Sequence, residues 1–334
     1  MILVTGGTGL VGSHLLLQLV QNKERIRAIY REGSNLKRVA TIFSYYVENP
    51  QELFDKIEWV KADLLDIPAL EAAFLDIEYV YHAAAFISFN PKKYHQLKKV
   101  NVLGTANIVN LCIAHSVKKL AYVSTIGTIG RSLKNQKTTE ENEWKEDHTN
   151  VYALTKYKAE MEVWRASQEN VPVVIINPGV IIGPGFWESG SGAFFTTANK
   201  GYSYFPPGGT GFISVMDVVK ILEQLMILPI QNERFITVSN NLSFKEILSF
   251  IATNLDRNIP KKELKIWQLQ IGRYADWLIC LLTKKERRIT KNSIFSLKNR
   301  EIYSSEKILK TIPLEFEDIK KTINFCSVLY KKER

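Results

Sequence analysis

Three glycines separate the first apolar segment of the chain from a long, largely apolar one. The stretch TGGTGLVG places Gly6 and Gly9 between ILV at 2–4 and LVGSHLLLQLV at 10–20, which has helical length, and Gly12 near the start of that second segment. Gly6 permits a tight turn, Gly9 lets the backbone approach a ligand closely, and Gly12 lets the helix pack closely on the strand. The chain is therefore predicted to open with a strand–turn–helix unit.

The turn of this unit has the properties of a phosphate-binding loop. The N–H groups at the start of a helix, here those of Leu10, Val11 and Gly12, have no intrahelical partners and lie at the positive end of the helix dipole. Together with the glycines they predict a pyrophosphate site for a dinucleotide. The alternative is a tight turn that binds no ligand.

Strands and helices alternate through the first half of the chain. Further strands are predicted at 25–30, 57–62, 77–85, 120–125 and 171–177, and helices at 68–75, at 94–115 and from Val151 onward. Near-continuous apolar strands that alternate with helices form a parallel sheet covered on both faces. We therefore expect an α/β fold, with a doubly wound parallel Rossmann-type sheet over residues 1–177.

The second half loses this alternation. Residues 178–211 are rich in Gly, Pro and aromatic side chains, a composition typical of loops that shape a site. Beyond them, strands are predicted at FISVMDVV (212–219) and RFITVS (234–239), and helices at 243–253 and 263–282. We expect residues 178–334 to form a smaller, mainly substrate-binding region of mixed α/β structure. A further strand and helix at about 210–240 are expected to return to the first domain.

The charge of the chain is basic but dispersed. The 334 residues carry a net charge of +10, with one dense group of basic residues between 284 and 291 and no recognisable nucleic-acid-binding motif. The members of that group are Lys284, Lys285, Arg287, Arg288 and Lys291. A solvated basic surface is therefore favoured, and no nucleic-acid partner is expected.

The three cysteines and the first residues bear on location. Cys112, Cys280 and Cys326 fit neither the spacing of a zinc site nor a CxxC motif, so reduced thiols and no metal site are expected. The opening MILVTGG has the pattern of a strand and a turn rather than of a signal peptide. These features predict a cytoplasmic protein.

The stretch IWQLQIGRYADWLICLL at 266–282 is apolar but interrupted by polar residues, so it is not expected to span a membrane. Its large apolar side chains Trp267, Ile271, Tyr274, Leu278 and Leu281 recur at helical spacing. They predict an amphipathic helix whose apolar face packs on the core. Contact with a membrane surface through 266–291 is the less favoured alternative.

The residue that follows the second predicted strand helps to choose between NAD and NADP. An acidic residue there binds the ribose 2′-hydroxyl of NAD, whereas an Arg accommodates the 2′-phosphate of NADP. Arg31 occupies this position, Glu32 follows it, and Lys37 and Arg38 lie close behind. NADP(H) is therefore favoured over NAD(H) as cofactor. The alternative for Lys37 and Arg38 is the solvated start of a helix.

Several short motifs occur in an order that resembles the extended short-chain dehydrogenases/reductases, the NAD-dependent epimerase/dehydratase superfamily. The motifs are TGGTGLVG, Asp63-Leu64, HAAA at 82–85, NVLGT at 101–105, VST at 123–125, YALTK at 152–156, NPGVIIGPG at 177–185 and ISVMDVV at 213–219. Within that superfamily, YREGSNLKRV at 30–39 is most similar to the dihydroflavonol-4-reductase and 3β-hydroxysteroid dehydrogenase branch.

This resemblance implies a role for each matching residue. Gly6, Gly9 and Gly12 would line the pyrophosphate of the cofactor. The remaining assignments are Arg31 and Lys37 at the 2′-phosphate, Asp63 and Leu64 beside the adenine, Ala83, Ala84 and Ala85 along the nicotinamide ribose, Asn101 at the cofactor, and Pro178 and Val180 near the nicotinamide ring. A homodimer formed by helix pairing is implied only by analogy with the family.

The chain departs from the superfamily pattern at a few positions. Thr125 stands where a second Ser is frequent, and it keeps a hydroxyl that can donate to a carbonyl; Ser124 is the second candidate for this role. Ile129 replaces a Tyr that is common in sugar-nucleotide epimerases, and Asn177 replaces an Arg that is common before Pro-Gly. The last two departures favour a reductase over an epimerase.

A Tyr and a Lys four residues apart occur three times, as Tyr94/Lys98, Tyr152/Lys156 and Tyr303/Lys307. The Lys lies on the same helix face as the Tyr, and its charge lowers the pKa of the phenol, which then serves as acid or base. Ligands bind at the carboxyl ends of the strands in a doubly wound sheet. Only the Tyr152 pair follows a strand end with hydroxyl side chains, so Tyr152 is predicted as acid/base, Lys156 as its modulator and Thr125 as the substrate-orienting hydroxyl.

One histidine and a set of mostly aromatic residues are further candidates for the site. His82, at a strand end, is expected to pack rather than to act as acid or base. Candidate pocket residues, with core packing as the equal alternative, are Ser88, Phe89, Trp187, Phe194, Phe195, Tyr204 and Phe205.

Three functions follow from these observations. The first is an NADP(H)-dependent reductase or dehydrogenase that acts on a small-molecule carbonyl or secondary alcohol. The second is a nucleotide-sugar epimerase or dehydratase with tightly bound NAD. The third is a non-catalytic dinucleotide-binding regulator, for which Tyr152→Phe would leave function intact.

Overall fold

One parallel sheet joins the strands of the first half of the chain and a later strand, β10 (Glu233–Thr237). The computed structural model describes residues 1–22, 24–132, 136–147, 149–283 and 291–334, without the side chains of 278, 281, 282, 291 and 292. Seven strands lie in the order β10-β6-β5-β4-β1-β2-β3, and all are parallel. They are β1 (Ile2–Thr5), β2 (Ile26–Tyr30), β3 (Glu58–Lys61), β4 (Tyr79–His82), β5 (Lys119–Val123), β6 (Val173–Pro178) and β10 (Glu233–Thr237). The order reverses between β1 and β4, which is the switch point where such sheets bind ligands.

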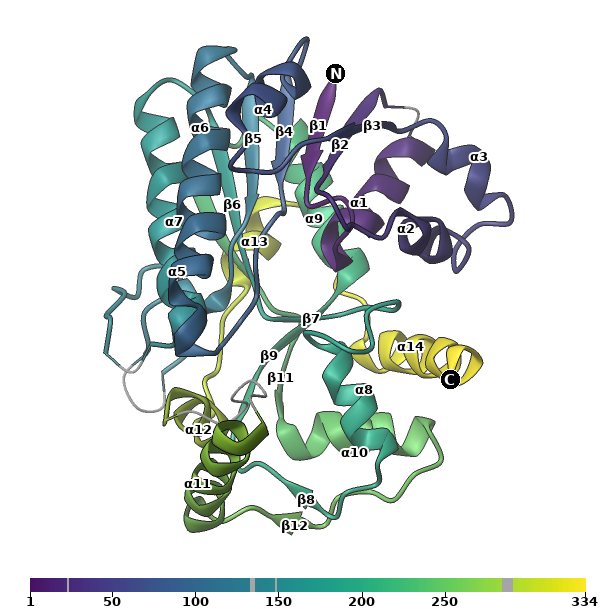
Figure 1. Ribbon diagram of the computed structural model, residues 1–334, viewed down its shortest axis with the longest axis vertical. Coiled ribbons are helices and arrows are strands. Elements are labelled where there is room, and N and C mark those ends of the chain that lie inside the picture. The colour runs from purple at the N-terminus through teal and green to yellow at the C-terminus, as the bar shows by residue number, and fades with distance from the viewer. Residues whose placement is uncertain (23, 133–135, 148, 284–290) are drawn as a thin grey trace.

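Helices cover both faces of this sheet because successive strand residues point to opposite sides. In β6, Val174 and Ile176 join a core cluster with α1 (Leu10–Gln21) and α9 (Val215–Ile227), and Val173 and Ile175 join the opposite cluster. The helices of that opposite side are α4 (Ile67–Ala73), α6 (Gly104–Ala114) and α7 (Val151–Gln168). Figure 1 shows α6 and α7 on one side of the sheet and α1 on the other. The predicted doubly wound Rossmann-type fold is confirmed.

Two other segments of the first half differ in detail from the predictions. The helix predicted at 94–115 comprises α5 (Tyr94–Leu97), the π-helical η2 (Lys98–Leu103) and α6 in direct succession. Between β2 and β3 lie α2 (Leu36–Phe43) and α3 (Pro50–Phe54), which the strand pattern did not predict. Asn35 caps α2 by accepting a hydrogen bond from the backbone N–H of Arg38.

A second, smaller region lies beyond the carboxyl ends of the main strands (Figure 1). Its sheet joins β7 (Val180–Ile182), β9 (Gly209–Ser214) and β11 (Asn240–Ser243), with β9 in the centre. The helices that share its core are α8 (Gly192–Asn199), α10 (Phe244–Asn254) and α14 (Ile319–Glu333). A short two-stranded sheet pairs β8 (Tyr204–Phe205) with β12 (Lys262–Glu263).

Of the strand predicted at 212–219, only residues 212–214 belong to a strand. β9 ends at Ser214, whose side chain accepts a hydrogen bond from the Met216 N–H and so begins helix α9. That helix packs on the main sheet, as do β10 and, after the second region, α13 (Glu306–Thr311). Both β10 and α9 lie between residues 210 and 240, and both belong to or pack on the main sheet.

The prediction of a core-facing helix at 263–282 is half right. The helix exists as α11 (Ile266–Thr283), followed by α12 (Lys291–Lys298). Its predicted core-facing side chains Trp267, Ile271 and Tyr274 are instead 59–62% exposed. The side chains of Leu278 and Leu281, and the basic stretch 284–290, lie outside the described residues. Among the helices that the structure describes, none has the length and apolar composition needed to cross a bilayer.

Candidate active site

The glycine loop runs from the end of β1 to the start of α1 and lies against the end of β4. Gly6 has φ +73°, and a Cβ there would lie 2.6 Å from the Ala84 backbone N. A Cβ on Gly12 would lie 2.1 Å from the Gly6 carbonyl oxygen, so both positions require glycine. The first turn of α1 has no side-chain cap and no acidic residue. The loop thus holds free backbone N–H groups near the switch point, as a pyrophosphate site needs.

The basic residues that follow β2 point in different directions. Arg31 is exposed and directly follows the strand, while Glu32 pairs with Lys61 on β3 at 3.3 Å. Lys37 is exposed on α2. Arg38 instead donates to the Gly185 carbonyl and faces a cavity.

This cavity has a volume of about 380 Å³ and adjoins the glycine loop. Its lining residues are Thr8, Asn35, Arg38, Phe186, Trp187, Glu188, Ser189, Glu333 and Arg334. Lys37 is absent from the lining, so the structure favours Arg38 over Lys37 as the second cation near a bound dinucleotide.

The other predicted cofactor residues lie along the same edge of the sheet. The Asp63 carboxylate accepts a hydrogen bond from the Leu65 N–H at 2.9 Å, and the Leu64 carbonyl accepts one from Asn107 at 2.8 Å. Of the alanine run after β4, Ala83 and Ala84 are partly buried and Ala85 is exposed. Pro178 ends β6, and Val180 begins β7 at the junction of the two regions.

Asn101 lies behind this edge rather than on it. Its side chain is 2% exposed and binds both the N–H and the carbonyl of Phe86, and it also donates to the Thr155 hydroxyl. These contacts fix the segment after β4 to η2 and α7. In this structure Asn101 therefore positions the site, and its direct contact with a cofactor stays a prediction.

Tyr152 and Lys156 stand in the first two turns of α7, which Asn150 caps. Lys156 is 1% exposed, and its ammonium nitrogen donates to the Tyr122 hydroxyl at 2.5 Å and to the Val123 carbonyl at 2.8 Å. Burial raises the pKa of Tyr152 to about 12. Burial also lowers the pKa of Lys156 to about 7, while Glu160 acts in the opposite direction. The expected lowering of the Tyr152 pKa is thus absent here, because burial of the phenol raises that pKa.

Tyr122 is a site residue that the sequence analysis missed. It is fully buried on β5, and the Lys156 nitrogen lies 4.0 Å from its ring centre. The His82 ring also stacks on the Tyr122 ring, with ring centres 5.4 Å apart. Tyr122 stands two residues before Ser124, so the period of a strand places it on the face that α7 covers.

The buried Lys156 makes the stability of the nucleotide-free protein depend on pH. Between pH 7 and 10.5, the ordinary lysine pKa, the unfolded chain binds a proton that the folded chain does not. The free energy of unfolding of wild type therefore rises with pH over this range, by at most about 1.4 kcal/mol per pH unit. Lys156→Met removes this titration. We expect its melting temperature to exceed wild type most at pH 7 and progressively less up to pH 9.5 in calorimetry; a constant difference would contradict the burial of the charge.

Thr125 and Ser124 diverge at the end of β5. The Thr125 side chain is partly exposed and accepts a hydrogen bond from the Gly127 N–H at 3.3 Å, which shapes the turn η3 (Ile126–Thr128). Ser124 is buried and donates to Glu160 at 2.5 Å. Of the two hydroxyls, only that of Thr125 is left on the accessible side, so the structure favours it as the substrate-orienting group.

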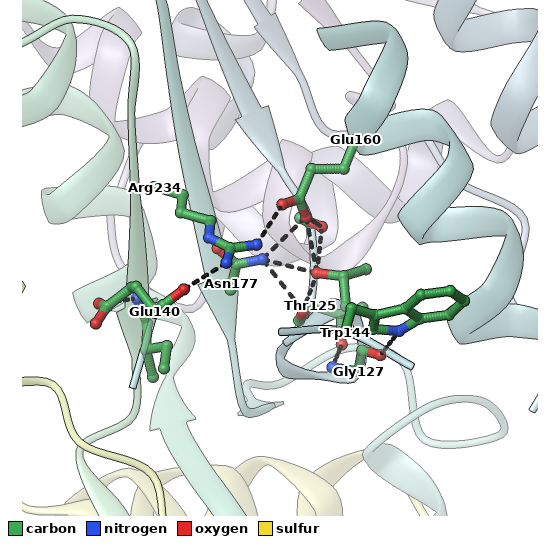
Figure 2. Close-up of polar contacts among 10 residues, drawn as sticks. Thr125, Gly127, Glu140, Trp144, Glu160, Asn177 and Arg234 are labelled. Carbon is green, nitrogen blue, oxygen red and sulfur yellow. Dashed lines mark hydrogen bonds and ion pairs between the residues drawn. The ribbon is translucent and has the colours of Figure 1, made fainter. Parts of the chain in front are cut away.

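Glu160 is the centre of a buried polar network behind this turn (Figure 2). Its carboxylate is 0% exposed and accepts from the Ser124 and Thr128 hydroxyls and, at 3.0 Å, from the Asn177 amide. Arg234 on β10 lies 3.4 Å away and supplies the cation. Arg234 also donates to the Glu140 carbonyl.

This network explains how the chain tolerates Asn177 where the superfamily commonly has Arg. The amide supplies a hydrogen bond, and Arg234 from the neighbouring strand supplies the positive charge. Glu160 lies one turn beyond Lys156 on the same helix face, a spacing that could have identified it. No local pattern could have identified Arg234 or Glu140, because Arg234 is 74 residues from Glu160 and 94 residues from Glu140.

The other two Tyr–Lys pairs lie elsewhere. Lys98 is exposed on η2, in agreement with the predicted helix surface. Tyr303 packs against the side chains of Ile236 and Val238, and Lys307 pairs with Glu233. That pair therefore attaches the chain to the edge strand β10.

The remaining candidates mostly belong to the core. His82 is 1% exposed between the hydroxyls of Thr5 and Thr105, and burial lowers its pKa to about 3, so it packs as predicted. Buried aromatic side chains of the second region are Trp187, Phe195 and Phe205, and Phe194 packs against the same core. Ser88 is partly buried and accepts from the Asn90 N–H, and Tyr204 is exposed on β8. Phe89 is exposed and contacts Tyr152 edge to face, with ring centres 5.7 Å apart.

Comparison with known proteins identifies the family. An NAD-binding family model described as male sterility protein matches residues 4–218. A putative dihydroflavonol 4-reductase of Synechocystis is 28% identical over 273 residues, 79% of this chain and 75% of that protein. The sterol demethylase protein B of Methylococcus capsulatus is 28% identical over 257 residues, 75% of this chain and 73% of that protein.

A solved structure extends the likeness to the whole fold. The UDP-glucose 4-epimerase of Thermotoga maritima, solved with UDP-glucose, superposes with a TM-score of 0.77 at 19% identity and covers 99% of both chains. At that identity the likeness concerns the fold alone. The family match and the reductase relative confirm the resemblance drawn from the motifs. The chain belongs to the male sterility protein family, within the extended short-chain dehydrogenase/reductase superfamily.

Proposed function

We propose that this chain is an NADP(H)-dependent reductase or dehydrogenase that transfers hydride between nicotinamide and an apolar carbonyl compound or secondary alcohol. One observation carries the proposal, which is the packing of η3 on the first turn of α7. A Cβ on Gly127 would lie 3.0 Å from the Cβ of Ala153, the residue after Tyr152. The Thr125 hydroxyl and the Tyr152 phenol are thereby held at the same strand end, where one carbonyl oxygen could meet both.

The residues at the switch point fit a dinucleotide. A Cβ on Gly9 would meet only the Gly6 carbonyl within 4 Å, so the outer side of the loop is open to a pyrophosphate. Arg31 and Arg38 supply positive charge next to this loop for a 2′-phosphate. When bound, the nicotinamide dinucleotide supplies or accepts the hydride.

The protonation states suit Tyr152 as a general acid. With its pKa raised to about 12, the phenol is neutral at pH 7 and has a proton for the oxygen of a carbonyl that is being reduced. Thr125 donates a hydrogen bond to the same oxygen and orients it. Protonated Lys156 stabilises the phenolate that Tyr152 leaves behind. Tyr122 and the Val123 carbonyl hold Lys156 at that position.

Exposed apolar side chains beside Tyr152 favour an apolar substrate. Phe89 is 52% exposed and Ile87 is 55% exposed, and both belong to the segment that follows β4. Phe89 contacts the Tyr152 ring directly. A substrate bound at Tyr152 would therefore cover apolar surface, which stabilises the complex in water. A panel of ketones of increasing apolar size, assayed with NADPH, tests this; a preference for charged or sugar substrates would contradict it.

Arg31 is expected to set the cofactor preference. Its replacement by Ala removes a charge-assisted hydrogen bond to the 2′-phosphate, so the affinity for NADPH should fall about tenfold or more while that for NADH stays the same. Fluorescence titration of wild type and Arg31→Ala with both nucleotides measures the change. Lys37→Ala, also a change of one exposed cation near β2, serves as the matched control and should leave both affinities unchanged. Tighter binding of NADH than of NADPH by wild type would contradict the proposed preference.

A further inference from the structure

Helix α11 presents its apolar side to solvent. Its exposed apolar side chains on one arc of the helix are Ile266, Trp267, Ile271, Tyr274 and Trp277, each between 44% and 62% exposed. We call this set the α11 face. At 100° per residue the five positions fall within an arc of about 140°. A monomeric protein rarely leaves so many large apolar side chains together in water, so this face needs a partner.

The inward side of α11 is more polar than the outward side. Leu269 is 6% exposed, but Arg273, Asp276 and Cys280 share its arc and are partly buried. The helix is therefore amphipathic in the opposite sense to a helix that serves only the core of its own domain. The more polar side of α11 faces the protein, and its apolar side faces solvent.

Basic and aromatic residues lie at the end of the α11 face where the helix begins. Lys261, Lys262 and Lys265 are exposed in the segment that leads into the helix, with Glu263 as the one acidic residue among them. Strand β12 pairs Lys262 with Tyr204 of β8, and Tyr204 is 44% exposed. Figure 1 places β8, β12 and α11 at the same end of the molecule, away from the N-terminal edge of the main sheet.

We propose that the α11 face docks on an anionic lipid bilayer surface. Trp and Tyr partition into the interface between headgroups and acyl chains, and lysines beside them attract anionic headgroups. A second copy of the chain fits less well. Two α11 faces in contact would bring two groups of three lysines together, on chains that each carry a net charge of +10. The basic residues Lys284, Lys285, Arg287 and Arg288 follow α11 in the sequence but lie outside the described residues.

The test is co-sedimentation of the full chain with vesicles. Vesicles of phosphatidylcholine with about one third phosphatidylglycerol should bind the protein, and vesicles of phosphatidylcholine alone should bind it at least tenfold more weakly at low salt. The double variant Trp267→Ser/Trp277→Ser should lose at least tenfold in affinity for the anionic vesicles, because it removes the two largest side chains that would enter the interface.

Two further variants separate this surface from general basic attraction. Lys261→Glu/Lys262→Glu/Lys265→Glu should also lose at least tenfold in affinity for the anionic vesicles. The matched control Ile67→Ser/Leu75→Ser changes two apolar side chains that are also more than half exposed, but on the first domain, and it should bind like wild type. Melting temperatures show whether each variant is folded. If the tryptophan variant does not fold, the lysine variant still tests the surface.

Three results would overturn the proposal. One is the absence of binding to anionic vesicles at low salt. Another is equal binding of wild type and the folded tryptophan variant, which would show attraction by net charge alone. The third is a dimer of wild type that the tryptophan variant abolishes in analytical ultracentrifugation, since the face would then be covered by a second copy.

Discussion

Tyr152→Phe should lower kcat for carbonyl reduction by about 10²- to 10⁴-fold, the range expected for the loss of a general acid. The variant keeps the ring and its contact with Phe89 but removes the proton that the neutral phenol holds at pH 7. NADPH should bind with unchanged affinity, because the glycine loop and the end of β2 are not touched. Steady-state kinetics with NADPH and an apolar ketone, together with a fluorescence titration, measure both quantities.

Tyr157→Phe is the matched control for this experiment. Tyr157 lies on the same helix, and its ring stacks on Trp144 with centres 3.9 Å apart. The loss of its hydroxyl should leave kcat unchanged. If Tyr152→Phe turned over as fast as wild type, the chain would not use this phenol, and the non-catalytic alternative would gain support.

Glu160→Ala should destabilise the fold by about 3–5 kcal/mol, the range measured when one member of a buried ion pair is removed. Its carboxylate is fully buried, and without it the two hydroxyls of Ser124 and Thr128 lose an acceptor and Arg234 loses its partner. The turn that carries Thr125 lies between those two hydroxyls, so kcat should fall as well. Urea unfolding gives the free energy of unfolding, and steady-state kinetics at a temperature where the variant is folded give kcat.

Glu162→Ala provides the comparison on the same helix. Glu162 forms a partly exposed ion pair with Arg165 at 2.9 Å, and such pairs contribute at most about 1 kcal/mol. An equal loss of stability in both variants would show that Glu160 contributes no more than a surface charge. Glu160→Gln keeps the size of the side chain and should recover part of the stability but not the charge interaction with Arg234.

The local features of this protein were readable because they depend on neighbours in the sequence. The glycine loop follows a strand and precedes a helix, and the close contacts of Gly12 are with Gly6 and Gly7 of the same turn. Tyr152 and Lys156 could be chosen among three pairs because strand order fixes which end of the sheet binds ligands. The α/β fold followed from the same alternation of apolar strands and helices.

Side-chain direction at a given position was less readable. Lys37 and Arg38 are adjacent, yet the helix rotates one into solvent and the other toward the cavity. Ser124 and Thr125 are also adjacent, and the pleat of the strand sends one to Glu160 and leaves the other accessible. Composition and motif could name the pair in each case, but only the backbone decides which member faces the site.

The sequence determined the parallel sheet, the glycine loop and the Tyr152–Lys156 pair, because short-range periodicity and spacing encode them. Only the tertiary structure decided that Arg234 neutralises Glu160, since that contact joins segments 74 residues apart. It also decided that Trp267 and Tyr274 face outward, which helical spacing cannot tell. Periodicity shows that a helix has an apolar side, but what covers that side depends on elements that meet it only after folding.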